Sequence, residues 1–272
     1  MGRYDSSLTR VQPVFDQLRS RDPSGESWIN KLLALPRFGS GHEARNRTYR
    51  LLSGREGTTY AWGEFEKALD PPLSLLRWLV RNLVDPENES ALGRSRTRQK
   101  REALIRRDPE VIAQALGLLE REPRTRAWYV FEGPSQPDVY LETEQAIIVI
   151  EGKRTEPGPT TRTTWMPCRH QMLRHLDCAW EIRNSRDVFG FFIVEGTSSG
   201  ELPPEWAKNA LRTVSNKALE DSLPHRRPSD REAIRQCFLG VTTWQAVCKE
   251  LGLEWSALPE KTTPNESIER TP

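Results

Sequence analysis

The sequence predicts an α/β protein with a mixed sheet of four or five strands flanked by helices. Three short segments rich in β-branched and aromatic residues, 127–132, 138–143 and 146–151, follow one another and are separated by turn residues, a pattern typical of successive strands. Apolar residues recur at helical spacing at 168–182, before a fourth strand-like segment at 188–194. Because a helix separates these last two strands, we expect parallel as well as antiparallel pairing.

The segment from Ile147 to Ile150 indicates which strand lies in the middle of this sheet. Its four residues are all apolar, whereas a strand with one solvated face alternates apolar and polar residues. We therefore expect this strand to be covered on both faces and to lie centrally.

The rest of the chain is mostly helical in pattern. We expect helices at 28–35, 43–52, 73–84, 108–120, 204–219, around 234 and at 244–251, with a further strand at 237–242. The Arg-rich stretch 85–107 is either a linker or the exposed face of a helix. This order predicts a helical N-terminal extension at 1–90, an α/β domain at 91–258 and a disordered tail at 259–272.

Composition excludes several classes of protein. The 272 residues carry 40 Lys and Arg against 38 Asp and Glu, a net charge of +2, so attraction to a polyanion would depend on local clusters. No apolar run is long enough to span a membrane, and no leader-like segment is present. The four cysteines form no CxxC pair, so we expect a cytoplasmic protein with free thiols. Nucleotide-loop, serine-hydrolase, metalloprotease and calcium-loop motifs are also absent.

Two carboxylates are expected to meet at one edge of the sheet. Asp138 begins the second strand and Glu151 ends the third, so antiparallel pairing through the turn at 143–145 places them side by side. Lys153 follows on the same face as Glu151. A divalent cation between the carboxylates, Mg²⁺ or Mn²⁺, would compensate their charges. The alternative is a neighbouring ion pair of Glu151 with Lys153, and a simple turn at Pro137 and Asp138.

These residues resemble the motif of the PD-(D/E)xK nuclease superfamily. Pro137-Asp138 and, after twelve intervening residues, Glu151-Gly152-Lys153 match it, and the expected order of elements over 108–197 is similar to its restriction-endonuclease-like αβββαβ core. The resemblance implies a Mg²⁺-dependent nuclease, with Mn²⁺ as an alternative ion. It also implies that Asp138, Glu151 and the Gly152 carbonyl hold the ion, and that Lys153 positions or activates the attacking water.

The helix after the third strand offers further candidates. Arg169 falls on its apolar, sheet-facing side and Gln171 flanks that side, whereas His170 points largely away. In the family this helix often carries a Gln, Arg or His that faces the active site, so we favour Arg169 and Gln171 and keep His170 as an alternative. Cys168, His170, His175 and Cys178 also suggest zinc, but 168 and 175 lie about 10 Å apart along a helix, too far for one ion.

The family commonly adds a glutamate from a helix before the sheet. Glu43 follows a Gly-rich turn and precedes two arginines, and Glu110 opens the helix just before the strands. We slightly prefer Glu43 as the catalytic glutamate. A surface carboxylate is the alternative for both.

Basic residues indicate the substrate. Between Lys153 and Arg186 they outnumber acidic residues seven to three, and cations attract phosphates without reading sequence. We expect Arg154, Arg162 and Arg169 to contact nucleic acid, DNA in the first place, and Trp165 to stack on a base. The alternative function is an inactive nuclease-fold protein that serves as a nucleic-acid-binding or scaffold subunit. Its oligomeric state and partner subunits stay open.

Overall fold

The computed structural model describes residues 5–41, 47–63, 65–121 and 127–261. Over these residues the chain is an α/β protein whose open sheet has six strands in the order β1-β6-β5-β4-β3-β2. The strands are β1 (Arg37–Phe38), β2 (Tyr60–Trp62), β3 (Val139–Glu142), β4 (Ala146–Lys153), β5 (Asp187–Val194) and β6 (Phe238–Thr243). The sheet is mixed, as expected, because β3 pairs antiparallel with β2 and β4 while β5 runs parallel to β4 and β6.

Strand β4 is the buried central strand that its apolar run predicts. It lies between β3 and β5, and its side chains alternate between two hydrophobic clusters. Ile148 and Ile150 belong to the cluster on one face, and Ile147 and Val149 to the cluster on the other. The strand therefore fixes the middle of the fold, and its last residues carry the motif to the edge of the sheet.

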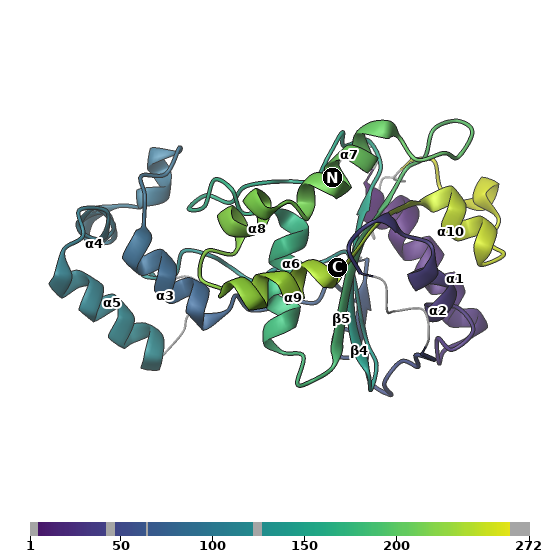
Figure 1. Cartoon of the computed structure of the whole chain (residues 1–272), viewed down its shortest axis with the longest axis horizontal. Helices are drawn as coiled ribbons and strands as arrows, with labels where there is room; N and C mark the ends of the chain where they lie inside the picture. Colours follow the sequence, from purple (N-terminus) through teal and green to yellow (C-terminus); the bar gives the residue numbers. More distant parts are fainter. Residues whose placement is uncertain (1–4, 42–46, 64, 122–126, 262–272) are drawn as a thin grey trace, which may run out of the picture.

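Helices cover both faces of the sheet (Figure 1). The first face packs against α1 (Gln12–Arg21), α2 (Ile29–Ala34) and α10 (Trp244–Glu250), with a π-helical turn at Ser7–Val11 before α1. The second face packs against the helices α6 (Gln171–Glu181), α7 (Pro204–Thr213), α8 (Asn216–Ser222) and α9 (Pro228–Gln236). The helix expected at 204–219 is thus two helices, because Ser215 caps α8 through its hydroxyl, which accepts from the Ala218 N–H at 3.2 Å.

Three helices form a separate hydrophobic cluster at one end of the molecule. They are α3 (Leu73–Asn82), α4 (Ser95–Ile105) and α5 (Pro109–Arg121), which lie at the left of Figure 1. Their apolar faces pack on one another and on Phe131, Trp165 and Met166. The stretch 85–107 is therefore mostly helical, after a 3₁₀ turn at Glu89–Leu92.

Two expected elements are wrong. Residues 127–132 form no strand: the Val130 N–H donates to the Ala127 carbonyl in a turn, and Tyr129 and Phe131 bury their side chains in the α3–α5 cluster. The short strand β2 takes the place beside β3 instead. Residues 47–52 form no helix, because Leu51 bridges to Thr143. Residues 43–46 of that expected helix lie outside the described residues.

The expected division of the chain also changes. The first 90 residues supply β1, β2 and the helices α1 and α2, whose side chains share the main core with the sheet. Pro259 and Glu260, expected to be disordered, accept hydrogen bonds through their carbonyls from Arg10 and Arg154. The tail from 262 onward lies outside the described residues. No helix among the described residues is long and apolar enough to cross a membrane.

Candidate metal-binding site

The ends of β3 and β4 bring Asp138 and Glu151 together. The register pairs Val139 with Ile150, so the residues one step further along each strand face each other. One Asp138 oxygen, Oδ2, accepts a hydrogen bond of 2.7 Å from the Gly152 N–H. Burial and the negative charge of Glu151 raise the pKa of Asp138 well above its ordinary value. Two carboxylates that repel each other in a buried place favour a proton or a cation between them.

Glu151 is buried and held by three side chains. Its Oε1 accepts from Lys153 Nζ at 2.8 Å and from Gln171 Nε2 at 2.6 Å, and its Oε2 lies 2.9 Å from His175 Nε2. Burial alone would raise its pKa, but the hydrogen bond and charge of His175, followed by the charge and hydrogen bond of Lys153, outweigh burial and lower the pKa. Glu151 is therefore stabilised as a carboxylate, the form that a metal ion requires.

Lys153 and Gly152 lie next to Glu151 at the end of β4. The Lys153 side chain is 13% exposed. Burial lowers the pKa of its ammonium, but the charge of Glu151 outweighs burial and raises it. At Gly152 a Cβ atom would lie 2.8 Å from both Trp244 and Val11 side-chain atoms, so only glycine fits. Since the N–H and C=O of one strand residue point to the same neighbour, the Gly152 carbonyl lies on the Asp138 side.

Helix α6 supplies Gln171, which the sequence placed near the site, and His175, which it did not. The two residues are one helical turn apart, so both reach Glu151. His175 Nδ1 lies 2.7 Å from the hydroxyl of Ser135, and Ser135 is fixed by two backbone hydrogen bonds to Leu69. This buried chain from Ser135 to Glu151 orients the carboxylate. The i, i+4 spacing of Gln171 and His175 was the signal that could have revealed His175.

Glu66 is a third carboxylate that sequence reasoning missed. It follows β2, which pairs with β3 so that Trp62 lies opposite Val139. Burial first, then the charges of Glu151 and Asp5, raise the pKa of Glu66, which shows that its carboxyl group lies within electrostatic reach of the site. No local pattern marks this residue, because its position depends on pairing between strands far apart in the sequence.

The donor set fits a hard divalent cation. Among the described residues, no group of three or more His, Cys, Asp or Glu side chains is arranged as a complete metal site. Mg²⁺ commonly binds through one or two carboxylates and keeps several water molecules, so Asp138, Glu151 and the Gly152 carbonyl would hold it with water. The amide oxygen of Gln171 is buried and has no hydrogen-bond partner within the described part of the chain. It is free to accept a hydrogen bond from such a water.

Arg169 does not face nucleic acid, contrary to our expectation. Its side chain is fully buried and contacts Glu132 at 3.0 Å and Asp177 at 2.8 Å, and Nη1 donates to the Ser222 carbonyl at 2.7 Å. Helical phase correctly placed the cation inside. Its anionic partners are two protein carboxylates rather than a phosphate, so its role is structural.

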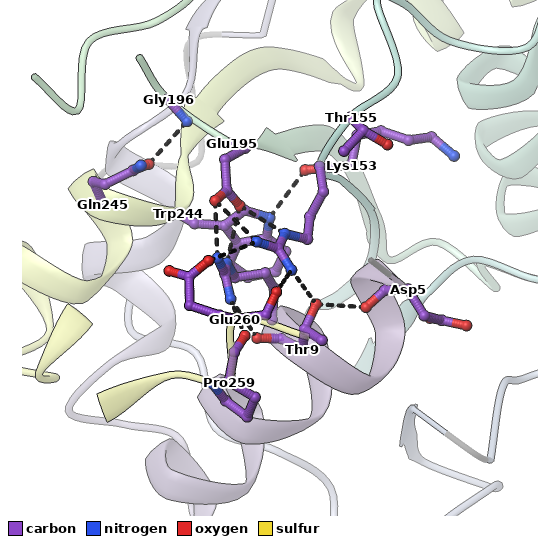
Figure 2. Close-up of polar contacts among 12 residues, drawn as sticks. Asp5, Thr9, Lys153, Thr155, Glu195, Gly196, Trp244, Gln245, Pro259 and Glu260 are labelled. Atoms are coloured by element: carbon purple, nitrogen blue, oxygen red, sulfur yellow. Dashed lines mark hydrogen bonds and ion pairs between the residues drawn. The ribbon is translucent and has the colours of Figure 1, made fainter. Parts of the chain in front are cut away.

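Arg154 is likewise unavailable to nucleic acid in this structure. Its side chain is only 6% exposed and pairs with Glu195 at 3.2 Å, while Nη1 donates to the Glu260 carbonyl at 2.9 Å. Figure 2 shows this cluster, in which Glu195 also accepts two hydrogen bonds from Arg10. The arginine after Lys153 therefore ties the end of β4 to the N-terminal and C-terminal segments.

Arg162 and Trp165 lie close together, but only one of them is exposed. The Arg162 side chain is 65% exposed and pairs with Glu87 at 2.9 Å. Trp165 is mostly buried and packs edge-on against Phe131, with ring centroids 5.1 Å apart. The expectation that Trp165 presents a ring face for stacking on a base is therefore wrong for this structure, although both residues line one pocket.

Of the two candidates for the extra glutamate, the structure describes Glu110 and does not bring it to the site. Glu110 is exposed at the start of α5, in the cluster that Figure 1 shows away from β4. Glu43 lies outside the described residues. Glu66 does interact with this site: burial first and then the charge of Glu151 raise the pKa of Glu66, and the charge of Glu66 is among those that raise the pKa of Asp138.

His170 is buried and its imidazole is held neutral. Its Nε2 lies 3.1 Å from the Thr213 hydroxyl, which itself donates to the Asn209 carbonyl, so Nε2 carries the proton. Burial, with a smaller contribution from the charge of His175, lowers the pKa of His170 from 6.5 to about 4. Its position beside the Thr213 hydroxyl explains why it does not reach Glu151.

This shift predicts a stability effect at acidic pH. Between pH 6.5 and 4 the unfolded chain protonates this imidazole and the folded protein does not, so stability is complete above pH 6.5 and falls as the pH drops. The wild-type protein should lose on the order of 3 kcal/mol more than His170→Gln over this range. Urea unfolding at pH 7 and pH 4.5 measures the difference. Parallel losses in both proteins would contradict it.

The fold and the site thus define an α/β protein with buried acidic and basic side chains at the ends of two adjacent strands. Comparisons with known proteins add no relative: no family model, no curated protein and no solved structure matches the chain.

Proposed function

We propose that the protein is a metal-dependent nuclease of the PD-(D/E)xK type that hydrolyses phosphodiesters of nucleic acid, DNA in the first place. The observation that carries the proposal is the meeting of Asp138 and Glu151 at the ends of paired strands, with Lys153 and Gln171 both bonded to Glu151. A chance ion pair between Glu151 and Lys153 would need neither the second carboxylate, Asp138, nor a residue of α6 bonded to Glu151.

The order of elements supports the same proposal. Strands β2, β3 and β4 pair antiparallel in succession, α6 follows, and β5 runs parallel to β4. With α1 earlier in the chain, and with α2 and β1 between it and β2, this order supports assignment to the αβββαβ core of the restriction-endonuclease-like fold. The first strand of that core is then β2 and not 127–132. The helices α3, α4 and α5 are then an insertion between the first and second strands.

Each residue of the site has a distinct role in the proposed hydrolysis. A bound Mg²⁺ or Mn²⁺ would supply charge that polarises the scissile phosphate and lowers the pKa of a bound water. Asp138 and Glu151 would hold the cation, and His175 keeps Glu151 oriented and ionised. The Lys153 ammonium is placed to stabilise the negative charge that develops on the phosphate. The unpartnered Gln171 oxygen can accept a hydrogen bond from the attacking water and so orient it.

The direct test is cleavage by purified protein. Supercoiled plasmid, single-stranded circular DNA and RNA are incubated with Mg²⁺, Mn²⁺, Ca²⁺ or EDTA. We expect cleavage of at least one substrate with Mg²⁺ or Mn²⁺, and none with EDTA or by Glu151→Gln. If no substrate is cleaved and nucleic acid is still bound, the alternative of an inactive nuclease-fold binding protein is favoured.

Metal binding gives an independent prediction. Asp138→Asn removes one carboxylate ligand and the repulsion that a cation relieves, so Mn²⁺ affinity should fall by at least about tenfold while the metal-free protein keeps or gains stability. Isothermal titration calorimetry and thermal melts with and without Mn²⁺ measure both effects. Asp221→Asn, which removes a partly exposed carboxylate paired with Lys217, is the control. Equal Mn²⁺ affinity in wild type and Asp138→Asn would remove the metal site.

A further inference from the structure

A pocket lies beside the candidate site, between α6 and the segments that lead to the α3–α5 cluster. Its volume is about 720 Å³, within the range of pockets that bind small molecules or single ligand groups. Its walls come from Glu87 and Asn88, the segment 130–133, the loop 160–167 and Arg174 of α6. Three parts of the chain that are distant in sequence therefore converge here.

The pocket is connected to the site through short contacts. Thr160, in its wall, accepts a 2.8 Å hydrogen bond from the Gln171 backbone N–H, and the Gln171 side chain contacts Glu151. Arg174 donates to the carbonyls of Gly133 and Pro134, directly before Ser135. Helix α6 thus lines the pocket through Arg174 and holds Glu151 through Gln171.

The other large pockets lie far from this chemistry. One is lined by Thr143, Glu144 and Gln145 at the turn before β4, and another by Asp187 and Val188 at the start of β5. Both are at the opposite end of strands that rise about 3.3 Å per residue, so roughly 15–25 Å separates them from Glu151 and Lys153. A ligand at either pocket would not touch a phosphate held at the site.

The lining of the pocket suits a nucleotide. Arg162, which pairs with the wall residue Glu87 at 2.9 Å, and Arg174 offer positive charge, and the mostly buried rings of Phe131 and Trp165 offer a small apolar surface. The threonines at 160, 163 and 164 and the amide of Asn88 offer hydrogen bonds of both kinds. The buried carboxylate of the wall, Glu132, is neutralised by Arg169 at 3.0 Å. The cationic groups match the phosphate of one nucleotide, and the small polar groups match the hydrogen-bonding edges of its base.

We propose that this pocket binds one unpaired nucleotide of the chain being cleaved, next to the scissile phosphodiester. A base inside a duplex is stacked and paired, so it cannot enter a pocket without leaving the helix. The substrate is therefore a single strand, or a duplex with an unpaired end or flap, rather than an intact duplex. This proposal rests on the nuclease function proposed above, because it names the class of substrate for that site.

The test uses binding and does not depend on cleavage. Fluorescence anisotropy with the full-length protein in EDTA compares labelled single-stranded DNA, single-stranded RNA of the same sequence and a blunt DNA duplex. Arg162→Ala and Thr164→Glu change exposed residues of the pocket, so both should fold. We expect each to weaken single-strand binding about tenfold, the scale of one stacked or ion-paired nucleotide, and to affect duplex binding little.

Matched controls come from the distant pocket at the turn before β4. Arg50 is an exposed arginine paired with Glu26, as Arg162 is with Glu87, and Ser53 is exposed like Thr164. Arg50→Ala and Ser53→Glu change charge equally and should leave single-strand affinity within about twofold. If control and pocket variants weaken binding equally, or if the duplex binds as tightly as the single strands, the proposal is overturned.

The outcome also separates this proposal from the nuclease function. Single-strand binding that depends on the pocket, without metal-dependent cleavage by the wild type, would support the nucleotide pocket and reject the nuclease. If the wild type cleaves nucleic acid and the pocket variants bind single strands normally, the nuclease function is supported and the nucleotide pocket is rejected. A loss confined to DNA or to RNA identifies which of the two supplies the nucleotide.

Discussion

Replacing Lys153 with methionine is expected to lower the rate of phosphodiester cleavage by about 10³-fold while divalent-cation binding is retained. The Lys153 ammonium lies 2.8 Å from Glu151 Oε1 and is the positive charge that the motif places beside the two carboxylates. Methionine keeps the length of the side chain but removes the charge. Gln171 and His175 still donate to Glu151 in the variant, so the carboxylate stays oriented for the cation.

Two measurements on the same preparations test this prediction. The nicking rate with Mg²⁺ reports catalysis, and calorimetric titration with Mn²⁺ reports the metal site. Lys67→Met is the matched control, because Lys67 is a partly buried lysine whose ammonium contacts the Gly57 and Thr58 carbonyls instead of a carboxylate. Cleavage by Lys153→Met at the wild-type rate would exclude the role given to Lys153. Loss of Mn²⁺ binding together with cleavage would make it part of the metal site.

The centre of the fold was predictable because short segments of the sequence determine it. A run of four apolar residues at 147–150 can be buried only between two layers, and the structure places them alternately in the clusters on the two faces. A short turn at 143–145 allows only antiparallel pairing of its flanking strands, which set Asp138 opposite Glu151. These two local facts were sufficient to locate the candidate metal site.

The outer strands were not predictable in the same way. Strands β1 and β2 have two and three residues, too few to show alternation, and each pairs with a strand distant in the sequence. The segment 127–132 has strong strand propensity, yet its aromatic side chains are buried against α3, α4 and α5. Tertiary packing outweighs propensity there. Glu66 was missed for the same reason, since its place depends on β2.

The arginines show what sequence patterns cannot predict, namely the anionic partner of each side chain. Helical phase correctly turned Arg169 inward, and charge clustering correctly marked 153–186 as basic. Neither pattern reveals which anion meets each guanidinium. Arg154 meets Glu195, Arg162 meets Glu87 and Arg169 meets two carboxylates. Because these partners come from distant parts of the chain, a local excess of positive charge overestimates the surface available to nucleic acid.

The second large effect is expected on stability and not on catalysis. Arg169→Met should lower the free energy of unfolding by about 3–5 kcal/mol, the range observed when one partner of a buried ion pair is removed. Glu132 and Asp177 are 1% and 0% exposed and would lose a buried cation with several hydrogen bonds. Asp177 keeps Arg226 at 2.7 Å. Glu132 keeps only a contact of 3.6 Å with Arg174 within the described residues, so it carries most of the loss.

A double-mutant cycle separates this explanation from simple loss of packing. If the stranded carboxylate causes the loss, Glu132→Gln combined with Arg169→Met should be less destabilised than the sum of the single variants, by at least about 1 kcal/mol. Urea unfolding followed by circular dichroism gives the four free energies. Arg77→Met, which breaks the exposed pair with Glu120, should cost less than about 1 kcal/mol. Additive effects in the cycle would instead assign the loss to packing around α6. Wild-type stability of Arg169→Met with impaired nucleic-acid binding would restore the role that the sequence suggested.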